Sequence, residues 1–162
     1  LNSERTAISE RLGTMHIDVT VEIMNESHLD DVAKIENACF AHPWSRKDLE
    51  AQLSIDTSHF IVASLNGRAV GYMGLQIFSG EGYVTNVAVL PEYRRQGIAE
   101  TLIAAQMKND MRFITLEVRK SNAAAIALYE KSGFENVGIR SKFYTDPTED
   151  AVIMTKYFEE QL

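Results

Sequence analysis

The sequence is poor in residues that could cross-link the chain or anchor it in a membrane. Its 162 residues include a single cysteine, Cys39, so an internal disulfide is excluded, and no Cys/His cluster has the spacing of a zinc site. No apolar run approaches the roughly 18 residues of a membrane-spanning helix. Residues 1–14 are polar and lack the apolar centre of a secretory signal, so we interpret them as a tail or a remnant of expression. These absences predict a cytoplasmic protein with no metal site and no membrane contact.

The composition is typical of a folded domain. Apolar residues make up 45% of the chain and charged residues 24%, a balance expected of a globular protein rather than a disordered one. A chain of 162 residues buries roughly two-thirds of its unfolded surface, enough for a core without disulfide or metal support. We therefore expect a single domain over residues 15–162.

Charge is distributed unevenly along the chain. The net charge is −7, whereas nucleic-acid-binding proteins usually present a basic surface, so direct binding to nucleic acid is not expected. Residues 94–142 nevertheless carry 9 basic and 5 acidic side chains, between two acidic segments. This pattern suggests a compact polyanionic ligand at the central segment and acidic surroundings that attract a cationic partner. A chance fluctuation would explain the charges alone equally well.

Hydrophobic periodicity predicts strands and helices in a mixed order. Asn66-Gly67 is a strong hairpin signal between two strands, and acidic variants of the capping box at Ser27 and Ser45 begin two helices. This order indicates a mixed α/β or α+β sheet with helices on its faces. The expected strands cover residues 16–24, 59–65, 68–78, 83–90, 113–119, 134–142 and 151–158, and the later helices cover residues 97–109 and 121–131.

A turn with the features of an anion site follows one of these strands. Arg94-Arg95-Gln96-Gly97-Ile98-Ala99 links the strand that ends at residue 90 to the next helix. Backbone N–H groups at a helix N-terminus point outward, the helix dipole favours an anion there, and glycine permits close approach to the backbone. The run is neither a Walker A loop nor a dinucleotide fingerprint. It predicts a phosphate-binding turn of another kind, with two exposed arginines at an ordinary junction as the alternative.

The motifs at and beyond this turn resemble those of the GCN5-related N-acetyltransferases, whose acetyl-coenzyme A loop reads Arg/Gln-x-x-Gly-x-Gly/Ala. Within that superfamily the chain is similar to the ribosomal-protein-alanine N-acetyltransferases (RimI-like proteins) over about residues 16–158. The resemblance implies a mixed, mostly antiparallel central sheet of about seven strands flanked by about four helices. The matching segments are Pro43-Trp44-Ser45, Asn86 to Val89, Leu116 to Arg119, Ser121 to Ala125, Leu128 to Lys131, Gly133-Phe134, Tyr144 to Pro147 and Glu149 to Met154.

The resemblance also implies an activity, the transfer of an acetyl group from acetyl-CoA to a protein amine. Glu117 matches the family's general base, and on a strand it shares one face with Arg119 while Leu116 and Val118 share the other. A surface ion pair between Glu117 and Arg119 is the alternative. Tyr129 matches the acid that protonates the departing thiolate, with a core aromatic as the alternative.

The same resemblance assigns positions to acetyl-CoA and to the acceptor. Asn122 matches a cofactor-binding position and is also placed to cap the helix that follows. Trp44 and Tyr144 match positions that line the acceptor entrance, and Phe143 stands where these enzymes commonly have a tyrosine. The remaining cofactor-binding positions are Val87, Ala88 and Val89 in a strand and Arg95, Gln96, Gly97, Ile98, Ala99 and Glu100 at the turn.

The acceptor implied by the resemblance is the N-terminal alanine of small-subunit ribosomal protein eighteen. An α-amine has a pKa of about 8, against about 10.4 for lysine, so it is more readily neutral at cellular pH and suits a single carboxylate base. A protein lysine or a broader set of N-termini is the alternative acceptor, and Phe143 is the reason to keep it. A non-catalytic acetyl-CoA sensor would need the turn and Asn122 but neither Glu117 nor Tyr129, and both are present.

Overall fold

The computed structural model describes residues 17–159, so the tail predicted over residues 1–14 lies outside the described residues. The strands are β1 (Thr20–Ile23), β2 (Ser58–Leu65), β3 (Arg68–Phe78), β4 (Glu81–Val89), β5 (Phe113–Arg119), β6 (Glu135–Tyr144) and β7 (Glu149–Tyr157). The α-helices are α2 (Leu29–Cys39), α3 (Arg46–Gln52), α4 (Ile98–Gln106) and α5 (Ala123–Lys131), and two 3-10 turns, η1 (Glu26–His28) and η2 (Pro91–Tyr93), precede α2 and α4.

The strands within residues 17–159 form one seven-stranded sheet in the order β1-β2-β3-β4-β5-β7-β6. Every neighbouring pair is antiparallel except β4 and β5, which run parallel. A parallel pair needs a crossover connection, and η2 with α4 supplies it. The predicted mixed, mostly antiparallel sheet flanked by four helices is therefore confirmed for this part of the chain.

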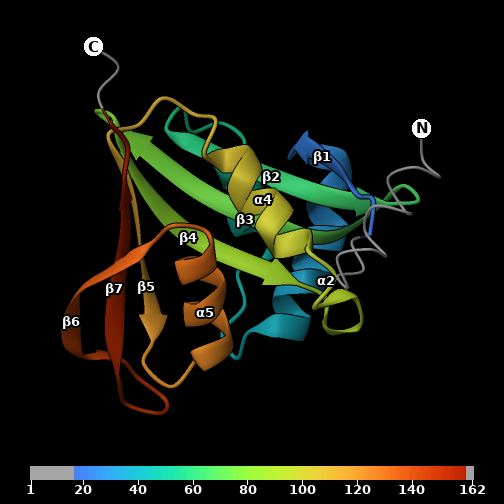
Figure 1. Cartoon of the computed structure of the whole chain (residues 1–162). Coiled ribbons are helices and arrows are strands. Elements are labelled where there is room, and N and C mark those ends of the chain that lie inside the picture. Colours follow the sequence, from blue (N-terminus) through green and yellow to red (C-terminus); the bar gives the residue numbers. More distant parts are fainter. Residues whose placement is uncertain (1–16, 160–162) are drawn as a thin grey trace, which may run out of the picture.

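Helices cover both faces of the sheet (Figure 1), with α4 and α5 in front of it and α2 behind. The front layer buries Leu102 of α4 in one hydrophobic cluster with Ile114 and Leu116 of β5. The rear layer buries Leu29 and Ile35 of α2 in a second cluster with residues of β2, β3 and β4. The alternate burial along β5 follows from the two-residue period of a strand, and it leaves Glu117 on the face opposite α4.

Two of the turn and cap predictions are confirmed. Asn66 and Gly67 have φ angles of 51° and 80° and join β2 to β3, as expected of a two-residue hairpin turn with both residues in the left-handed region. Ser45 caps α3 and exchanges hydrogen bonds with Asp48 in a complete capping box. These local signals hold because cap and turn chemistry is satisfied within four residues.

The cap predicted at Ser27 is wrong. Asn25 is the N-cap: its side chain accepts a hydrogen bond of 2.9 Å from the Ser27 N–H, and its own N–H donates to His28 Nδ1 at 3.0 Å. The resulting turn is η1, after which α2 begins at Leu29. Both Asn25 and Ser27 are good capping residues, and Asn25 takes the role because its backbone is extended there, with φ −133°.

The ends of several elements differ from the predicted boundaries. The strand predicted to begin at residue 16 begins at Thr20, β4 begins at Glu81 and α5 begins at Ala123. The predicted helix over residues 97–109 spans only Ile98–Gln106, and the residues after it make the tighter i to i−3 hydrogen bonds, from Lys108 to Ala105 and from Asn109 to Gln106. Among the described residues, no helix is long and apolar enough to cross a membrane.

Candidate active site

The parallel strands β4 and β5 separate soon after they begin. Their pairing runs only from Glu81 opposite Phe113 to Tyr83 opposite Thr115, and Figure 1 shows the two strands diverging beyond that point. A bulge lies at this point, since β3 pairs with Val84 and Asn86 of β4 and skips the residue between them. The later part of β4 therefore offers backbone N–H and C=O groups along an edge that no described strand pairs.

The predicted cofactor residues of β4 lie along this open edge. Val87 is half-buried, whereas Ala88 and Val89 are buried. The Val89 carbonyl accepts a hydrogen bond of 2.9 Å from Arg94 Nε, and Cys39 Sγ lies 3.5 Å from the same oxygen. These residues can pack in the sheet core and still bind the cofactor through their backbone. Their side chains point above and below the sheet, whereas their backbone N–H and C=O groups point sideways from the strand edge.

The turn before α4 has the backbone shape of an anion site. Arg95 and Gly97 have positive φ angles of 60° and 80°, and Gly97 is the N-cap of α4. Glycine adopts this conformation freely, whereas Arg95 pays a steric cost, so the turn is held by its surroundings. None of the N–H groups from Gly97 to Glu100 donates to an acceptor within residues 17–159. Four free donors at a helix N-terminus are what a phosphate group needs.

Arg94 and Arg95 differ in their roles. The Arg94 side chain turns back onto the protein, where Nε donates to the Val89 carbonyl and Nη2 lies 3.4 Å from Cys39 Sγ. Arg94 thus fixes the start of the turn to β4 and α2. Arg95 is exposed and has no salt-bridge partner among the described residues, so its charge is available to a ligand.

Glu117 lies on β5 beyond the last residue that pairs with β4. Its side chain is 31% exposed, and Oε1 lies 3.6 Å from Nε of Arg140 on β6. The alternative pair with Arg119 is not formed, because Arg119 pairs with Glu149. A partly exposed carboxylate at the separation of the two strands can reach a substrate amine directly or through water.

Tyr129 of α5 is half-buried and packs edge-on against Phe134, with ring centroids 5.6 Å apart. Burial, together with a smaller effect of Tyr144, raises the pKa of Tyr129 to about 12. Burial also raises the pKa of Tyr144, as does the negative charge of Glu117. The Tyr144 ring centroid lies 4.4 Å from the guanidinium carbon of Arg119, which shares a strand face with Glu117, so Tyr144 lies over that face of β5. Tyr129 is therefore both a packed aromatic and a fully protonated donor at neutral pH.

Asn122 caps α5, and its side-chain oxygen accepts a hydrogen bond of 3.2 Å from the Ala125 N–H. The cap interpretation is thus correct, and the exposed side chain leaves the cofactor role as a prediction. The far end of α5 is joined to α4 by an ion pair of 3.1 Å between Lys131 and Glu100. Glu100 therefore already has a cationic partner within the protein.

Trp44 and Tyr144 lie in two segments that approach each other. Trp44 belongs to the acceptor loop, by which we mean residues 40–45 between α2 and α3. Tyr144 is at the end of β6, and the turn that follows it reaches the acceptor loop where His42 Nε2 lies 3.3 Å from Asp146 Oδ2. No sequence pattern points to His42, because its partner is 104 residues away.

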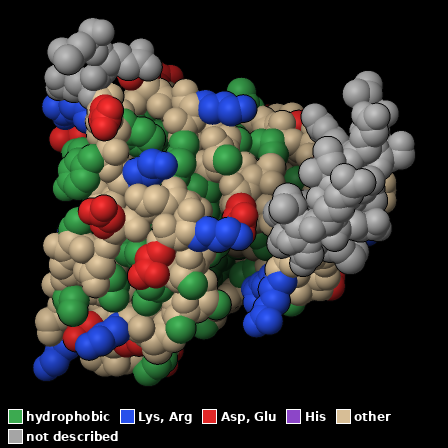
Figure 2. All heavy atoms as spheres, in the orientation of Figure 1, with side chains coloured by type: hydrophobic (Ala, Val, Ile, Leu, Met, Phe, Trp, Pro, Cys, Tyr) green, Lys and Arg blue, Asp and Glu red, His purple; other side chains and the backbone are tan. Residues whose placement is uncertain are grey.

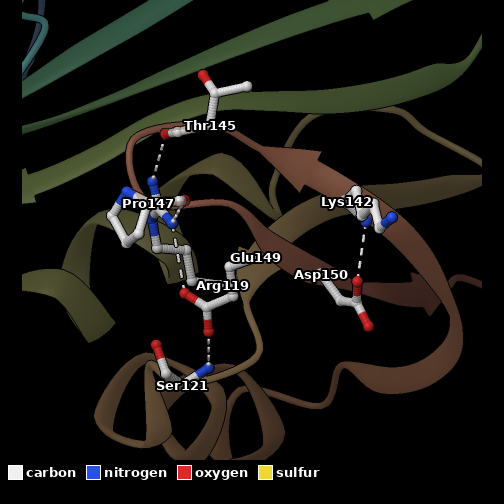
Figure 3. A network of polar contacts seen from close by, with 7 residues as sticks. All are labelled: Arg119, Ser121, Lys142, Thr145, Pro147, Glu149 and Asp150. Carbon is white, nitrogen blue, oxygen red and sulfur yellow. Dashed lines mark hydrogen bonds and ion pairs between the residues drawn. The ribbon is translucent and has the colours of Figure 1, made fainter.

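Arg119 is a further site residue that sequence reasoning did not single out (Figure 3). Its guanidinium donates to the carbonyls of Thr145 and Pro147 at 3.3 and 3.0 Å and lies 4.4 Å from the centroid of the Tyr144 ring. Its ion pair with Glu149 completes the clamp on this turn. The signal available beforehand was its position two residues after Glu117 on the same strand face.

Other surface features do not gather functional side chains. A hollow of about 960 Å³ lies at the start of β5, between Gly80, Met107 and Phe158, and contains none of the predicted site residues. Figure 2 shows the face covered by α4 and α5, where Lys/Arg and Asp/Glu side chains are interspersed rather than gathered by sign. The site is therefore defined by the separation of β4 and β5.

Comparison with known proteins places this fold among the N-acetyltransferases. The crystal structure of the ribosomal-protein-S18-alanine N-acetyltransferase from Escherichia coli superposes with a TM-score of 0.78 and 34% identity, over 90% of this chain and 99% of that one. The [ribosomal protein bS18]-alanine N-acetyltransferase of Escherichia coli (strain K12) is 37% identical over 141 residues, 83% of this chain and 95% of the relative. An N-alpha-acetyltransferase of Saccharolobus solfataricus is 35% identical over 156 residues, 86% of this chain and 93% of the relative.

The acetyltransferase (GNAT) family description matches residues 29–134, which contain the open edge of β4, the turn before α4, Glu117 and Tyr129. The chain belongs to this family. It is an acetyl-CoA-dependent N-acetyltransferase, as the sequence motifs implied.

Proposed function

We propose that this enzyme acetylates the N-terminal alanine of ribosomal protein bS18, with Glu117 as general base and Tyr129 as general acid. The observation that carries the proposal is the position of Glu117 on β5, just beyond the last pair with β4 and on the strand face where Arg119 contacts Tyr144. The relative named for this acceptor supports it at 37% identity over 95% of its own length. A cytoplasmic location follows from this acceptor and is part of the same proposal.

The arrangement suits direct transfer between two substrates bound at once. The open edge of β4 and the free N–H groups of Gly97 to Glu100 would hold acetyl-CoA, with Arg95 and Asn122 beside it. Glu117 would remove a proton from the acceptor amine as it attacks the thioester carbonyl. Tyr129, whose pKa is raised to about 12, would return a proton to the departing thiolate. No covalent enzyme intermediate is required, so Cys39 needs no chemical role.

A broader N-terminal specificity is the second candidate. The Saccharolobus solfataricus relative is named for N-alpha-acetylation without a ribosomal acceptor, and Phe143 departs from the pattern of the ribosomal-protein enzymes. Phe143 is 45% exposed and packs edge-on against Tyr144 at 5.0 Å, so it lies beside a residue of the proposed acceptor entrance. Either candidate uses the same Glu117 and Tyr129 chemistry.

The test is to compare transfer from acetyl-CoA to three peptides by mass spectrometry. One carries the bS18 N-terminus with a free alanine and no lysine, the second has an unrelated free N-terminus, and the third has a blocked N-terminus and an internal lysine. We expect acetylation of the first at a rate well above the others. Equal rates on the first two would favour the broader candidate, and transfer to the lysine peptide alone would overturn both.

A further inference from the structure

A carboxylate outside the proposed chemistry is buried in the rear layer of the protein. Glu36 of α2 is 1% exposed, and no Lys, Arg or His within residues 17–159 lies at salt-bridge distance from it. A buried carboxylate costs several kcal/mol unless hydrogen bonds replace its lost water. Glu36 must therefore be stabilised by neutral donors, and it was not among the residues that the sequence motifs pointed to.

Three donors from three different elements meet at this carboxylate. Oε1 accepts hydrogen bonds from the Tyr72 hydroxyl of β3 and, at 2.7 Å, from Asn86 Nδ2 of β4, while Oε2 accepts from the Trp44 N–H at 3.0 Å. Burial raises the pKa of Tyr72, and its hydrogen bond to Glu36 raises it further, so the hydroxyl remains a donor at any physiological pH. Charge-assisted hydrogen bonds of this kind are stronger than neutral ones.

The donors connect the two halves of the proposed site. Asn86 comes directly before Val87 at the open edge of β4, and Trp44 belongs to the acceptor loop. The Trp44 ring lies 6.0 Å from that of Phe60, which lies 6.2 Å from that of Tyr72. Trp44 is thus connected to Glu36 in two ways: its backbone N–H binds the carboxylate directly, and its ring packs on Phe60, which packs on Tyr72, a donor to the same carboxylate.

We propose that Glu36 is a positioning residue that holds the acceptor loop at the distance from β4 that the acceptor peptide requires. The proposal rests on the proposed function, in which Trp44 lines the acceptor entrance. Glu36 itself is buried and touches neither substrate. What it determines is acceptor binding, because its reach sets where Trp44 lies relative to Asn86.

Two variants of Glu36 separate the reach of the side chain from its charge. E36Q keeps the length of the side chain. Its amide oxygen can accept from the Trp44 N–H, and its NH₂ group then faces Tyr72 and Asn86. The Asn86 amide can rotate by 180° so that its oxygen accepts from this NH₂ group. E36D keeps the charge but is one methylene shorter, so it cannot serve Trp44 and Asn86 together. V32A is the matched control, since Val32 is a fully buried residue of α2 whose apolar side chain takes no part in the hydrogen bonds of Glu36.

The experiment combines kinetics with fluorescence, because Trp44 is the only tryptophan of the chain. In E36D we expect the Trp44 emission to shift to the red and to be quenched more readily by acrylamide. The KM for the alanine peptide should rise about tenfold, with kcat and the KM for acetyl-CoA within about threefold of wild type. E36Q should stay close to wild type in emission and in KM. V32A should unfold at a lower temperature without changing either.

Each other outcome overturns the proposal in a distinguishable way. Unchanged emission in E36D means that Glu36 does not hold the loop, and shifted emission with unchanged peptide KM means that the loop does not determine acceptor binding. A larger defect in E36Q than in E36D means that charge rather than reach matters. Failure of the wild-type enzyme to acetylate any peptide overturns the proposed function instead, and Trp44 emission then still decides whether Glu36 holds the loop.

Discussion

Arg119 Nη1 lies 3.3 Å from Glu149 Oε1, and the other oxygen of that carboxylate accepts a hydrogen bond of 2.6 Å from the Ser121 N–H. This pair joins the end of β5, the segment before α5 and the turn with Thr145 and Pro147 that follows β6 (Figure 3). We expect R119A to raise the KM for the acceptor peptide about tenfold, because the loss of charged hydrogen bonds at a partly exposed site is worth about 1–2 kcal/mol. Steady-state kinetics with varied peptide measure this.

The matched control for R119A is R46A. Arg46 also pairs with two carboxylates, Asp30 and Glu50, but these pairs lie on the exposed surface of α2 and α3. R46A should leave the KM for both substrates unchanged. If R119A leaves the peptide KM unchanged as well, the clamp has no part in acceptor binding.

Glu149 makes the stability of this clamp dependent on pH. The hydrogen bond with Ser121, followed by the contact with Arg119, holds the pKa of Glu149 below its usual value of 4.5. A carboxyl group with a lowered pKa in the folded state stabilises the fold above the usual pKa and loses that contribution as the pH falls through the lower value. We expect E149Q to unfold at a lower temperature than wild type at pH 7. The difference should shrink below about pH 4, and a difference that grows on acidification would contradict the assignment.

The sequence predicts the parts of this fold that depend on near neighbours. The hairpin at Asn66 and the cap at Ser45 are each completed within a few residues, and the alternation along β5 follows from strand geometry alone. The cap at Ser27 was predicted wrongly because two capping residues compete within three positions. Asn25 is the cap because His28, three residues later, completes a capping box with it. The usual capping box has Glu or Gln at that third position, so the sequence pattern did not reveal this one.

Contacts between distant segments could not be predicted from the same patterns. The pairs Glu117 with Arg140 and His42 with Asp146 join elements that only the folded sheet brings together. Glu36 is the instructive case, because it follows Val32 by four positions and so falls on the buried stripe of α2. The sequence pattern shows that Glu36 lies on the buried stripe. It does not show the hydrogen-bond donors that stabilise the buried carboxylate, because they come from β3, β4 and the acceptor loop.

Replacement of Glu117 by glutamine tests the general base. We expect E117Q to lower kcat about 100-fold at pH 7, since a positioned base contributes that order of rate. The ratio of wild-type to variant rates should shrink towards pH 9, where an α-amine with a pKa of about 8 is already neutral in solution. E81Q is the control, because Glu81 is a β4 carboxylate that pairs with Arg112 at the other end of the strand. A pH-independent ratio would argue against proton removal by Glu117.

The titration of Tyr129, the proposed acid, concerns the alkaline side of the rate–pH profile. Burial raises its pKa to about 12, so the phenol stays protonated and the wild-type rate should show no alkaline loss from this group up to pH 10. We expect Y129F to lower kcat by about 100-fold or more with the Kd for acetyl-CoA unchanged. Folding stability should fall as the pH rises from about 10 to about 12, because only the folded state keeps the proton in that range, and this fall should be smaller in Y129F.

The control for Y129F is Y83F, since Tyr83 is an exposed tyrosine whose hydroxyl donates to Glu81. Y83F should retain the wild-type rate and pH profile. A full rate in Y129F with acetyl-CoA bound would exclude it as the proton donor.

Gly74 of β3 lies opposite the bulge in β4, close to the point where β4 and β5 separate. It pairs with Asn86 at the point where the register skips Thr85, and a Cβ there would meet the Thr85 side chain and lie 2.6 Å from Cζ of Phe60. Phe60 cannot withdraw, because it is 4% exposed and packs against Tyr72, so G74A must shift β3 or β4. We expect G74A to lower the free energy of unfolding by about 2–3 kcal/mol.

Because the bulge lies close to where β4 leaves β5, we expect G74A to weaken acetyl-CoA binding along with stability. Denaturant unfolding measures the first effect and calorimetry of the still-folded variant the second. G138A on β6 is the control, because the nearest atom to its new Cβ, Ile153 Cδ1, is at an ordinary 3.9 Å. G138A should change both quantities little. Lost stability in G74A with unchanged acetyl-CoA affinity would show that the strand separation does not depend on this bulge.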